Sequence, residues 1–133
     1  MKTHLCFLAI ACAALSATPA ASQDAPNFFA ETYPSSSLDQ AMQWYGSLSG
    51  PDSPLDAKTR ELVALGVSAQ IPCDYCVYAH ASGARNAGAT EEEIRAAVAT
   101  AGAVRNWSTV LNGMSYDLDA FKQEYDSMSA ASN

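Results

Sequence analysis

Basic residues are scarce in this 133-residue sequence, which has 7 lysines and arginines against 14 aspartates and glutamates. No basic cluster offsets the acidic excess. A surface of this charge repels phosphate backbones, so we expect no nucleic acid partner.

Long apolar runs are also absent. The run from Leu5 to Leu15 is shorter than the roughly 20 residues that a membrane-spanning helix needs, so we expect no membrane span.

The short apolar run instead has the pattern of an export signal. Lys2 precedes it, and the small residues Ala20 and Ser22 follow it. We therefore expect residues 1–22 to be a signal peptide cleaved near Ser22, and the protein to be exported, either to the periplasm or as a secreted protein. Lipidation at Cys12 is a weaker alternative, because only a few apolar residues precede that cysteine.

Cysteine is also rare, and cleavage of the signal peptide would leave only one pair of cysteines to explain. Cys6 and Cys12 would leave with the signal peptide, so Cys73 and Cys76 would remain alone. In an oxidising compartment such a pair is either a structural disulfide or a dithiol that cycles through one. Because a loop this short constrains the unfolded chain little, it stabilises poorly. We therefore favour a redox role over a structural one.

Strand patterns are missing from the remaining chain, whereas helical signals recur. Residues 23–133 suffice for one small domain, and without Lys2 they carry six basic and fourteen acidic residues, a net charge of −8. We expect residues 23–34 to be a mobile arm, residues 35–128 the domain, and residues 129–133 a frayed tail. The predicted fold class is all-α, a compact array of five or six short helices.

Caps and helix breakers predict where these helices begin and end. Apolar residues cover most of the predicted second helix, so we expect it to be buried. The predicted boundary signals, in chain order, are a cap at Ser36 or Ser37, a stop at Gly50-Pro51, starts with proline in the first turn at Ser53-Pro54 and Ile71-Pro72, a stop at Gly88, a capping box from Thr90 to Glu93, a short break at Gly102, and a cap at Ser115.

The most informative segment is Cys73-Asp-Tyr-Cys76-Val-Tyr-Ala-His80. On a helix, Cys73, Cys76 and His80 fall within one sector of about 60°. Pro72 would place both thiols near a helix N-terminus, where free N–H groups and the helix dipole favour a thiolate. His80 lies one turn after Cys76 and can accept its proton. This stripe therefore indicates a redox site.

Two other chemistries use the same residue types. Zinc prefers Cys and His ligands, but a structural zinc site needs four, and the only other histidine, His4, lies in the leader. We expect no metal, although a catalytic zinc with an open position stays an alternative. The thioredoxin arrangement requires a strand before the Cys-x-x-Cys helix in a mixed α/β domain, and no such pattern occurs here.

The segment from Leu55 to Ile94 resembles the carboxymuconolactone decarboxylase superfamily, specifically its alkyl hydroperoxidase D-like branch, and the similarity extends more loosely to Gly113. The spacing of a glutamate, the Cys-Asp-Tyr-Cys motif and a histidine carries the resemblance. It implies an all-helical domain that oligomerises, commonly as a trimer or hexamer, around a thiol peroxidase site.

By position, the resemblance implies a role for four residues. Cys76 matches the cysteine that attacks peroxide, Cys73 matches the resolving cysteine, and His80 and Glu61 match the proton relay. Helical geometry puts Glu61 at the margin of an apolar face, which is compatible with that role. From the residues alone, an ion pair at the surface with a neighbouring lysine or arginine, Lys58 or Arg60, is the simpler interpretation.

The function implied by the resemblance is an exported thiol-dependent hydroperoxide reductase. It takes a hydroperoxide as substrate, needs an external dithiol reductant and has no bound cofactor. Export leaves alternative functions open, because an oxidising compartment keeps dithiols oxidised to disulfides. These are a thiol–disulfide exchange protein without peroxidase activity, a decarboxylase acting on muconolactone, and a noncatalytic helical oligomer with a stapled turn. The cysteine pair disfavours the decarboxylase, since that branch of the superfamily does not use one.

Overall fold

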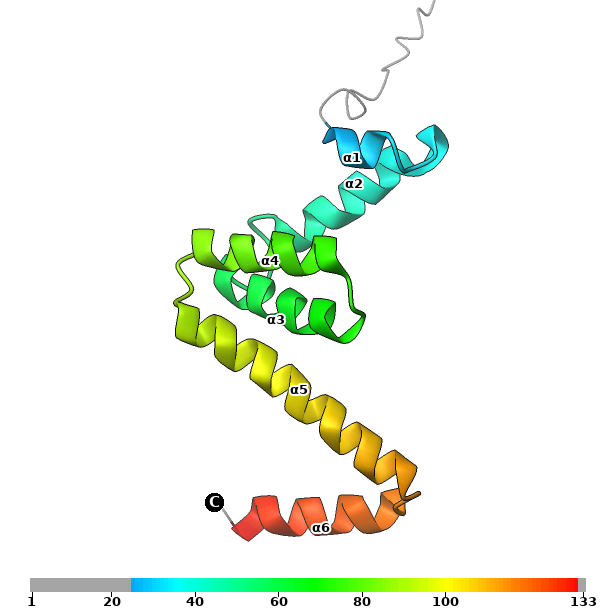
Figure 1. The fold of residues 1–133 in the computed structure, drawn as a ribbon, viewed down its shortest axis with the longest axis vertical. Coiled ribbons are helices and arrows are strands. Elements are labelled where there is room, and N and C mark those ends of the chain that lie inside the picture. Colours follow the sequence, from blue (N-terminus) through cyan, green and yellow to red (C-terminus); the bar gives the residue numbers. More distant parts are fainter. Residues whose placement is uncertain (1–24, 132–133) are drawn as a thin grey trace, which may run out of the picture. The chain divides into compact units, whose positions relative to one another are not determined.

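The computed structural model describes residues 25–131, and within this range the chain is helical and contains no strand (Figure 1). The all-α prediction is confirmed for this part of the chain. The helices are α1 (Asn27–Ala30), α2 (Ser35–Ser49), α3 (Ala57–Gln70), α4 (Asp74–Asn86), α5 (Glu91–Gly113) and α6 (Leu118–Ala131). None of these helices is long and apolar enough to cross a membrane.

The chain divides into two units between Pro51 and Asp52, with α1 and α2 in the first unit and α3 to α6 in the second. Residues 1–22, the predicted signal peptide with Cys6 and Cys12, lie outside the described residues. Within the predicted arm the structure places α1, and α6 continues to Ala131, beyond the predicted end of the domain at residue 128.

Two helix starts in the first half of the chain differ from the prediction. Helix α2 begins at Ser35 directly after Pro34, which makes no side-chain cap, so the predicted serine caps at 36 or 37 are wrong. Helix α3 begins at Ala57 rather than at Pro54, because Asp56 is a better cap. The Asp56 carboxylate accepts hydrogen bonds from the Thr59 N–H at 3.0 Å and the Thr59 hydroxyl at 2.7 Å.

The start of α4 also differs from the prediction, and the difference changes the position of Cys73. Pro72 lies outside the helix, and Cys73 is its N-cap residue, so the prediction of a first-turn proline is wrong. The stop at Gly88 is confirmed. Its φ of +83° lies in the left-handed region that glycine adopts without a Cβ clash, and it follows the last turn of α4.

Helix α5 begins with the predicted capping box. The Glu93 N–H donates to the Thr90 hydroxyl at 3.2 Å, and the Thr90 N–H donates to the Glu93 carboxylate at 2.7 Å. The predicted break at Gly102 is wrong, since α5 runs through it to Gly113. A single helix glycine costs only about 1 kcal/mol, which a helix of this length tolerates.

The last helix is capped by Asp117 rather than by Ser115. The Asp117 carboxylate accepts from the Ala120 N–H at 2.8 Å, whereas Ser115 lies in the preceding turn with a φ of +51°. The predicted serine cap is therefore wrong by two positions, because the turn between α5 and α6 uses that serine in a left-handed conformation.

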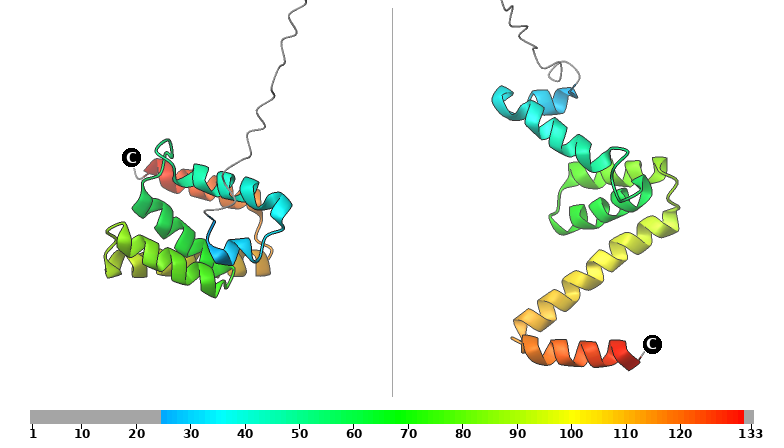
Figure 2. Two further views of the ribbon diagram at one scale, coloured as in Figure 1. Left: turned by 90° about the horizontal axis from the view of Figure 1, so that it is seen from above. Right: turned by 180° about the vertical axis from the view of Figure 1, so that it is seen from behind.

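The core of the second unit lies where α3, α4 and α5 meet. Leu65 of α3, Ala84 of α4 and Ile94 of α5 are buried together. The prediction that α3 is buried is correct for one face only, because Val63 and Val67 are 56% and 55% exposed. The shared core holds α3 against α4, side by side in both Figure 1 and Figure 2, and thereby positions the residues described below.

An ion pair joins the first turns of α3 and α5. Lys58 Nζ lies 2.8 Å from Glu93 Oε1. The hydrogen bond from Lys58, followed by those from Thr90, lowers the pKa of Glu93 from 4.5 to about 2. The same pair raises the pKa of Lys58. Glu93 thus connects the capping box of α5 to α3.

We expect this pair to make the fold sensitive to acid. The contribution of Glu93 is present in full above about pH 5 and is lost as the pH falls toward about 2, because the unfolded carboxyl binds its proton first. Glu93→Gln should therefore lose less stability over that range than the natural protein, as measured by urea unfolding. Glu92→Gln, which alters an exposed pair with Arg95, is the matched control. Equal acid sensitivity in all three proteins would contradict the assignment.

Candidate active site

Helical spacing places three residues on one face of α3, and this face packs against α4. Glu61, Leu65 and Ser68 lie four and three residues apart, so they share that face. Leu65 and Ser68 are 1% and 3% exposed. Glu61, one turn earlier, is held at the same junction with only 18% of its side chain exposed. The Glu61 carboxylate thus lies beside α4, whereas the residues alone favoured an ion pair at the surface.

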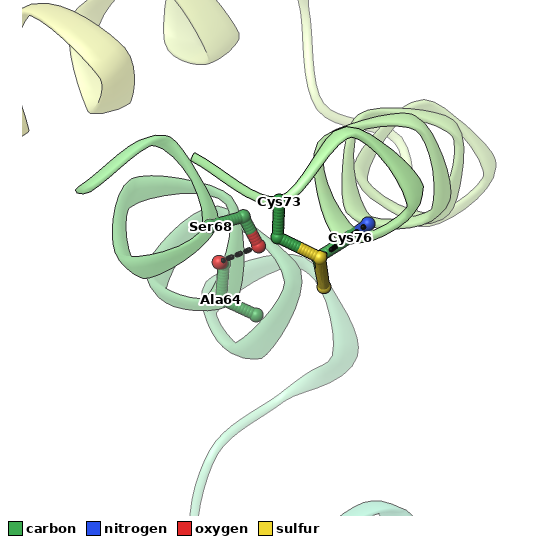
Figure 3. Close-up of a disulfide and its surroundings, with 4 residues drawn as sticks. All are labelled: Ala64, Ser68, Cys73 and Cys76. Atoms are coloured by element: carbon green, nitrogen blue, oxygen red, sulfur yellow. Dashed lines mark hydrogen bonds between the residues drawn. A yellow bond between two sulfur atoms is a disulfide. The ribbon is translucent and has the colours of Figure 1, made fainter. Parts of the chain in front are cut away.

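The two cysteines lie at the start of α4 and form a disulfide in this structure (Figure 3). Their Cα atoms are 5.3 Å apart, and both residues are partly buried. Cys73 is the N-cap, and its sulfur accepts a hydrogen bond from the Cys76 N–H at 3.2 Å. After reduction, the free N–H groups of this helix end favour a thiolate at the same place.

The end of α3 anchors the start of α4. The Cys73 N–H donates to the Ser68 carbonyl at 3.2 Å across the intervening loop. The buried Ser68 hydroxyl is satisfied within α3 by donating to the Ala64 carbonyl at 2.7 Å (Figure 3). This arrangement fixes where the disulfide lies relative to α3. Ser68 belongs to no motif in the sequence, and its spacing from Leu65 is the only signal of its position on this face.

Glu61 and His80 are brought together across the α3–α4 junction. Glu61 Oε2 lies 2.8 Å from His80 Nδ1, and the His80 side chain is 21% exposed. Because a carboxylate only accepts hydrogen bonds, Nδ1 carries the hydrogen, and Nε2 of the neutral ring is left to accept a proton. By contrast, Arg60 Nε is 3.9 Å from Glu61, and Lys58 pairs with Glu93.

Gly83 makes room for this carboxylate. A Cβ atom at position 83 would lie 2.6 Å from Glu61 Oε2 and 2.9 Å from Glu61 Cδ, closer than atoms of this kind approach each other. Gly83 and Ala84 are adjacent small residues, which let α3 come close to α4. The structure adds that the close neighbour of Gly83 is the Glu61 side chain itself.

The four predicted site residues therefore lie on two adjoining helix faces. Cys73, Cys76 and His80 follow one another along α4, and Glu61 reaches His80 from α3. In the reduced protein, a thiol, an imidazole and a carboxylate in this order are groups that can act as nucleophile, base and orienting group. Within residues 25–131, no three His, Cys, Asp or Glu side chains are grouped so that they could hold a metal ion.

Comparison with known proteins adds a family and two relatives. The model of the carboxymuconolactone decarboxylase family matches residues 37–117. A Paracoccus denitrificans protein described as "Uncharacterized protein 4 in cox locus" is 35% identical over 69 residues, which cover 52% of this chain and 62% of that protein. An uncharacterized Haemophilus influenzae protein is 49% identical over 42 residues, 32% of this chain and 37% of its own. The chain thus matches less than two thirds of either relative's length.

Proposed function

We propose that this chain, which belongs to the carboxymuconolactone decarboxylase family, reduces hydroperoxides with electrons from an external dithiol. The observation that carries the proposal is the 2.8 Å contact between Glu61 and His80 on the helix that begins with the Cys73–Cys76 disulfide. The contact supports the proposal because it joins a carboxylate to an imidazole one helical turn after Cys76. Placement in the alkyl hydroperoxidase D-like branch of the family is part of this proposal.

The first step oxidises Cys76. Its proton passes to His80, whose ring Glu61 orients, and the thiolate attacks the distal oxygen of the hydroperoxide. The S–O bond forms as the O–O bond breaks. The departing alkoxide takes a proton and leaves as alcohol, or as water when the substrate is hydrogen peroxide, and Cys76 becomes a sulfenic acid.

The second step closes the disulfide, and the third step restores the dithiol. The Cys73 thiol attacks the Cys76 sulfenic acid, which forms the S–S bond and releases water. An external dithiol then exchanges with that disulfide, becoming oxidised itself and returning both cysteines to thiols. Each cycle thus moves two electrons from the dithiol to one hydroperoxide, without a bound cofactor.

We place this cycle in the periplasm or outside the cell, because residues 1–22 have the pattern of an export signal. That location requires a reductant outside the cytoplasm, since the surrounding compartment oxidises dithiols. The proposed reductant is a protein or small molecule with a dithiol of lower reduction potential than the Cys73–Cys76 pair.

Thiol–disulfide exchange without peroxide is a second candidate function. It is favoured by the disulfide itself, whose two cysteines are only partly buried at the start of α4. Exposure permits attack by a partner thiol, as exchange requires. The same exchange is the last step of the peroxidase cycle, so the two candidates differ in whether Cys76 reacts with peroxide.

The deciding experiment follows consumption of cumene hydroperoxide by the purified protein with excess dithiothreitol. We expect catalytic consumption with one disulfide formed in the reductant for each peroxide removed. Protein alkylated at its thiols after reduction is the control. Absence of turnover, with the pair confirmed as reduced, would contradict the peroxidase. The reduction potential would then separate an exchange protein from a structural staple, for which a value below about −300 mV is typical.

A further inference from the structure

The position of the disulfide on α4 gives its reduction a preferred direction. An incoming thiolate approaches one sulfur in line with the S–S bond, from the side opposite the sulfur that leaves. Around α4, Cys76 lies about 60° from Cys73 in one direction, and Ala84 lies about 20° from Cys73 in the other. Ala84 belongs to the buried core. A thiolate that attacks Cys73 would therefore approach from the core side, whereas one that attacks Cys76 approaches from the open side of the α3–α4 junction.

The leaving sulfur is also better stabilised at Cys73. This residue is the N-cap of α4, and its sulfur already accepts a hydrogen bond from the Cys76 N–H at 3.2 Å. A thiolate released at this place keeps that bond and gains from the helix dipole. A well-stabilised thiolate leaves more readily in disulfide exchange. Both the direction of approach and the leaving group thus select Cys76 as the sulfur that is attacked.

Two uncharged residues of α4 lie beside Cys76 on the open side. Ala79 and Tyr75 lie about 60° and 100° beyond Cys76, in the direction that leads away from the core. Both are exposed, and Tyr75 is exposed by 89%. A thiolate that reaches Cys76 therefore passes these two side chains.

The end of α3 supplies the other border of the same side. Ile71 and Val67 lie about 60° and 100° from Ser68, in the direction away from Leu62, which packs on the core. The two helices run antiparallel (Figure 1), so this direction leads to the open side on α3 as it does on α4. Ile71 and Val67 are 62% and 55% exposed. We call Val67, Ile71, Tyr75 and Ala79 the Cys76 surface.

The Cys76 surface has the composition of a protein interface. None of the 14 acidic and 7 basic residues of the chain belongs to it. Exposed apolar side chains that lie together mark interaction sites, and the centre of a protein interface is depleted of charge and enriched in tyrosine. Small molecules bind instead in concave sites. The apolar groove of about 480 Å³ between α3 and α5 contains neither cysteine.

From this arrangement we infer that the Cys76 surface docks a protein reductant, namely a dithiol protein whose reactive cysteine lies in an exposed, uncharged, apolar surface of its own. Two such surfaces match because neither leaves a charge buried without a partner. The inference rests on the reduction step of the proposed function, which thiol–disulfide exchange shares. It narrows the reductant from any dithiol to a protein.

The exchange then proceeds in two steps. The partner thiolate attacks the Cys76 sulfur, so that a bond between the two proteins forms as the Cys73–Cys76 bond breaks. Cys73 leaves as a thiolate and takes a proton from water. The second thiol of the partner next attacks the partner's own sulfur in the mixed disulfide and releases Cys76 as a thiolate. Two electrons pass to this chain, which becomes a dithiol, and the partner becomes a disulfide.

Reduced thioredoxin, a small dithiol protein, is the probe for this surface. Rate constants for reduction of the disulfide are measured without peroxide, once with thioredoxin and once with dithiothreitol, which is too small to need a docking surface. Thioredoxin should be the faster reductant of the natural protein. In Tyr75→Asp and in Ile71→Asp, the ratio of the two rate constants should fall about 10-fold or more, as loss of an interface hot spot predicts.

Tyr78→Asp is the matched control for Tyr75→Asp. Tyr78 is 78% exposed on the same helix, but it lies about 160° around α4 from Cys76. The added charge is the same, and the ratio of rate constants should equal that of the natural protein. Circular dichroism checks that each variant is helical, and the exposure of all three positions favours an intact fold.

Trapping the mixed disulfide identifies the attacked sulfur. Thioredoxin that retains only its reactive cysteine is mixed with the oxidised protein in the presence of iodoacetamide, which alkylates the released thiol. Peptide mass spectrometry should find thioredoxin on Cys76 and the alkyl group on Cys73.

Three results would overturn the inference. They are reduction of the natural protein by thioredoxin no faster than by dithiothreitol, an equal fall of the ratio in Tyr78→Asp and Tyr75→Asp, and attachment of thioredoxin to Cys73. Peroxide consumption by the natural protein with dithiothreitol is independent of all three. Failure of the docking surface is therefore distinguishable from failure of the proposed function.

Discussion

Cys76→Ser is expected to reduce hydroperoxide turnover to the rate without enzyme, whereas reduced Cys73→Ser, freed of added dithiol, should complete one oxidation and then stop. The difference arises because only Cys76 forms a bond to the peroxide oxygen. Cys73 acts afterwards, when it converts the Cys76 sulfenic acid to a disulfide. Quantitative peroxide assays with a sulfenic acid trapping reagent measure both outcomes. We expect Cys73→Ser to consume one peroxide per chain and to retain the trapped adduct.

The structure supplies a control for the Cys73 variant. Cys73 is the N-cap of α4, and its sulfur accepts a hydrogen bond from the Cys76 N–H. Serine is a preferred cap, so Cys73→Ser preserves the start of the helix, whereas Cys73→Ala removes the hydrogen-bond acceptor. Single oxidation by Cys76→Ser, with none by Cys73→Ser, would reverse the assigned roles.

Gly83→Ala is expected to lower the turnover rate about 100-fold while leaving the fold intact. The new Cβ would lie 2.6 Å from Glu61 Oε2, so the carboxylate must move away from His80 Nδ1. Loss of a positioned proton acceptor costs at least this factor in general acid–base catalysis. Steady-state kinetics with cumene hydroperoxide measure the rate, and the change should fall on kcat/KM for peroxide.

Gly83 is a positioning residue here, so its test needs a readout beyond activity. The ultraviolet absorbance of the Cys76 thiolate, followed against pH in the reduced protein, should change in Gly83→Ala and in Glu61→Gln alike. Gly102→Ala is the matched control, because a Cβ at this helical glycine meets nothing within 4 Å. A normal thiolate titration and a normal rate in Gly83→Ala would show that the Glu61–His80 contact does not support the chemistry.

The local features of the protein could be predicted from its sequence. Helix periodicity, the capping box from Thr90 to Glu93 and the stop at Gly88 involve residues within one or two turns of each other, and all three are confirmed. The alignment of Cys73, Cys76 and His80 is equally local, because it depends only on helical spacing. The errors were also local, where a stronger neighbouring cap such as Asp56 or Asp117 prevailed.

The sequence by itself thus determined an all-helical chain of a recognisable family and the row of thiols and imidazole on α4. Only the tertiary structure decided that Glu61 lies against His80, that Gly83 leaves space for that carboxylate, and that one side of α3 stays exposed. These facts depend on how α3 packs on α4 through Leu65 and Ala84. The packing of the two helices sets the contacts between residues 19 or more positions apart. Helical spacing within one segment does not specify how two helices pack.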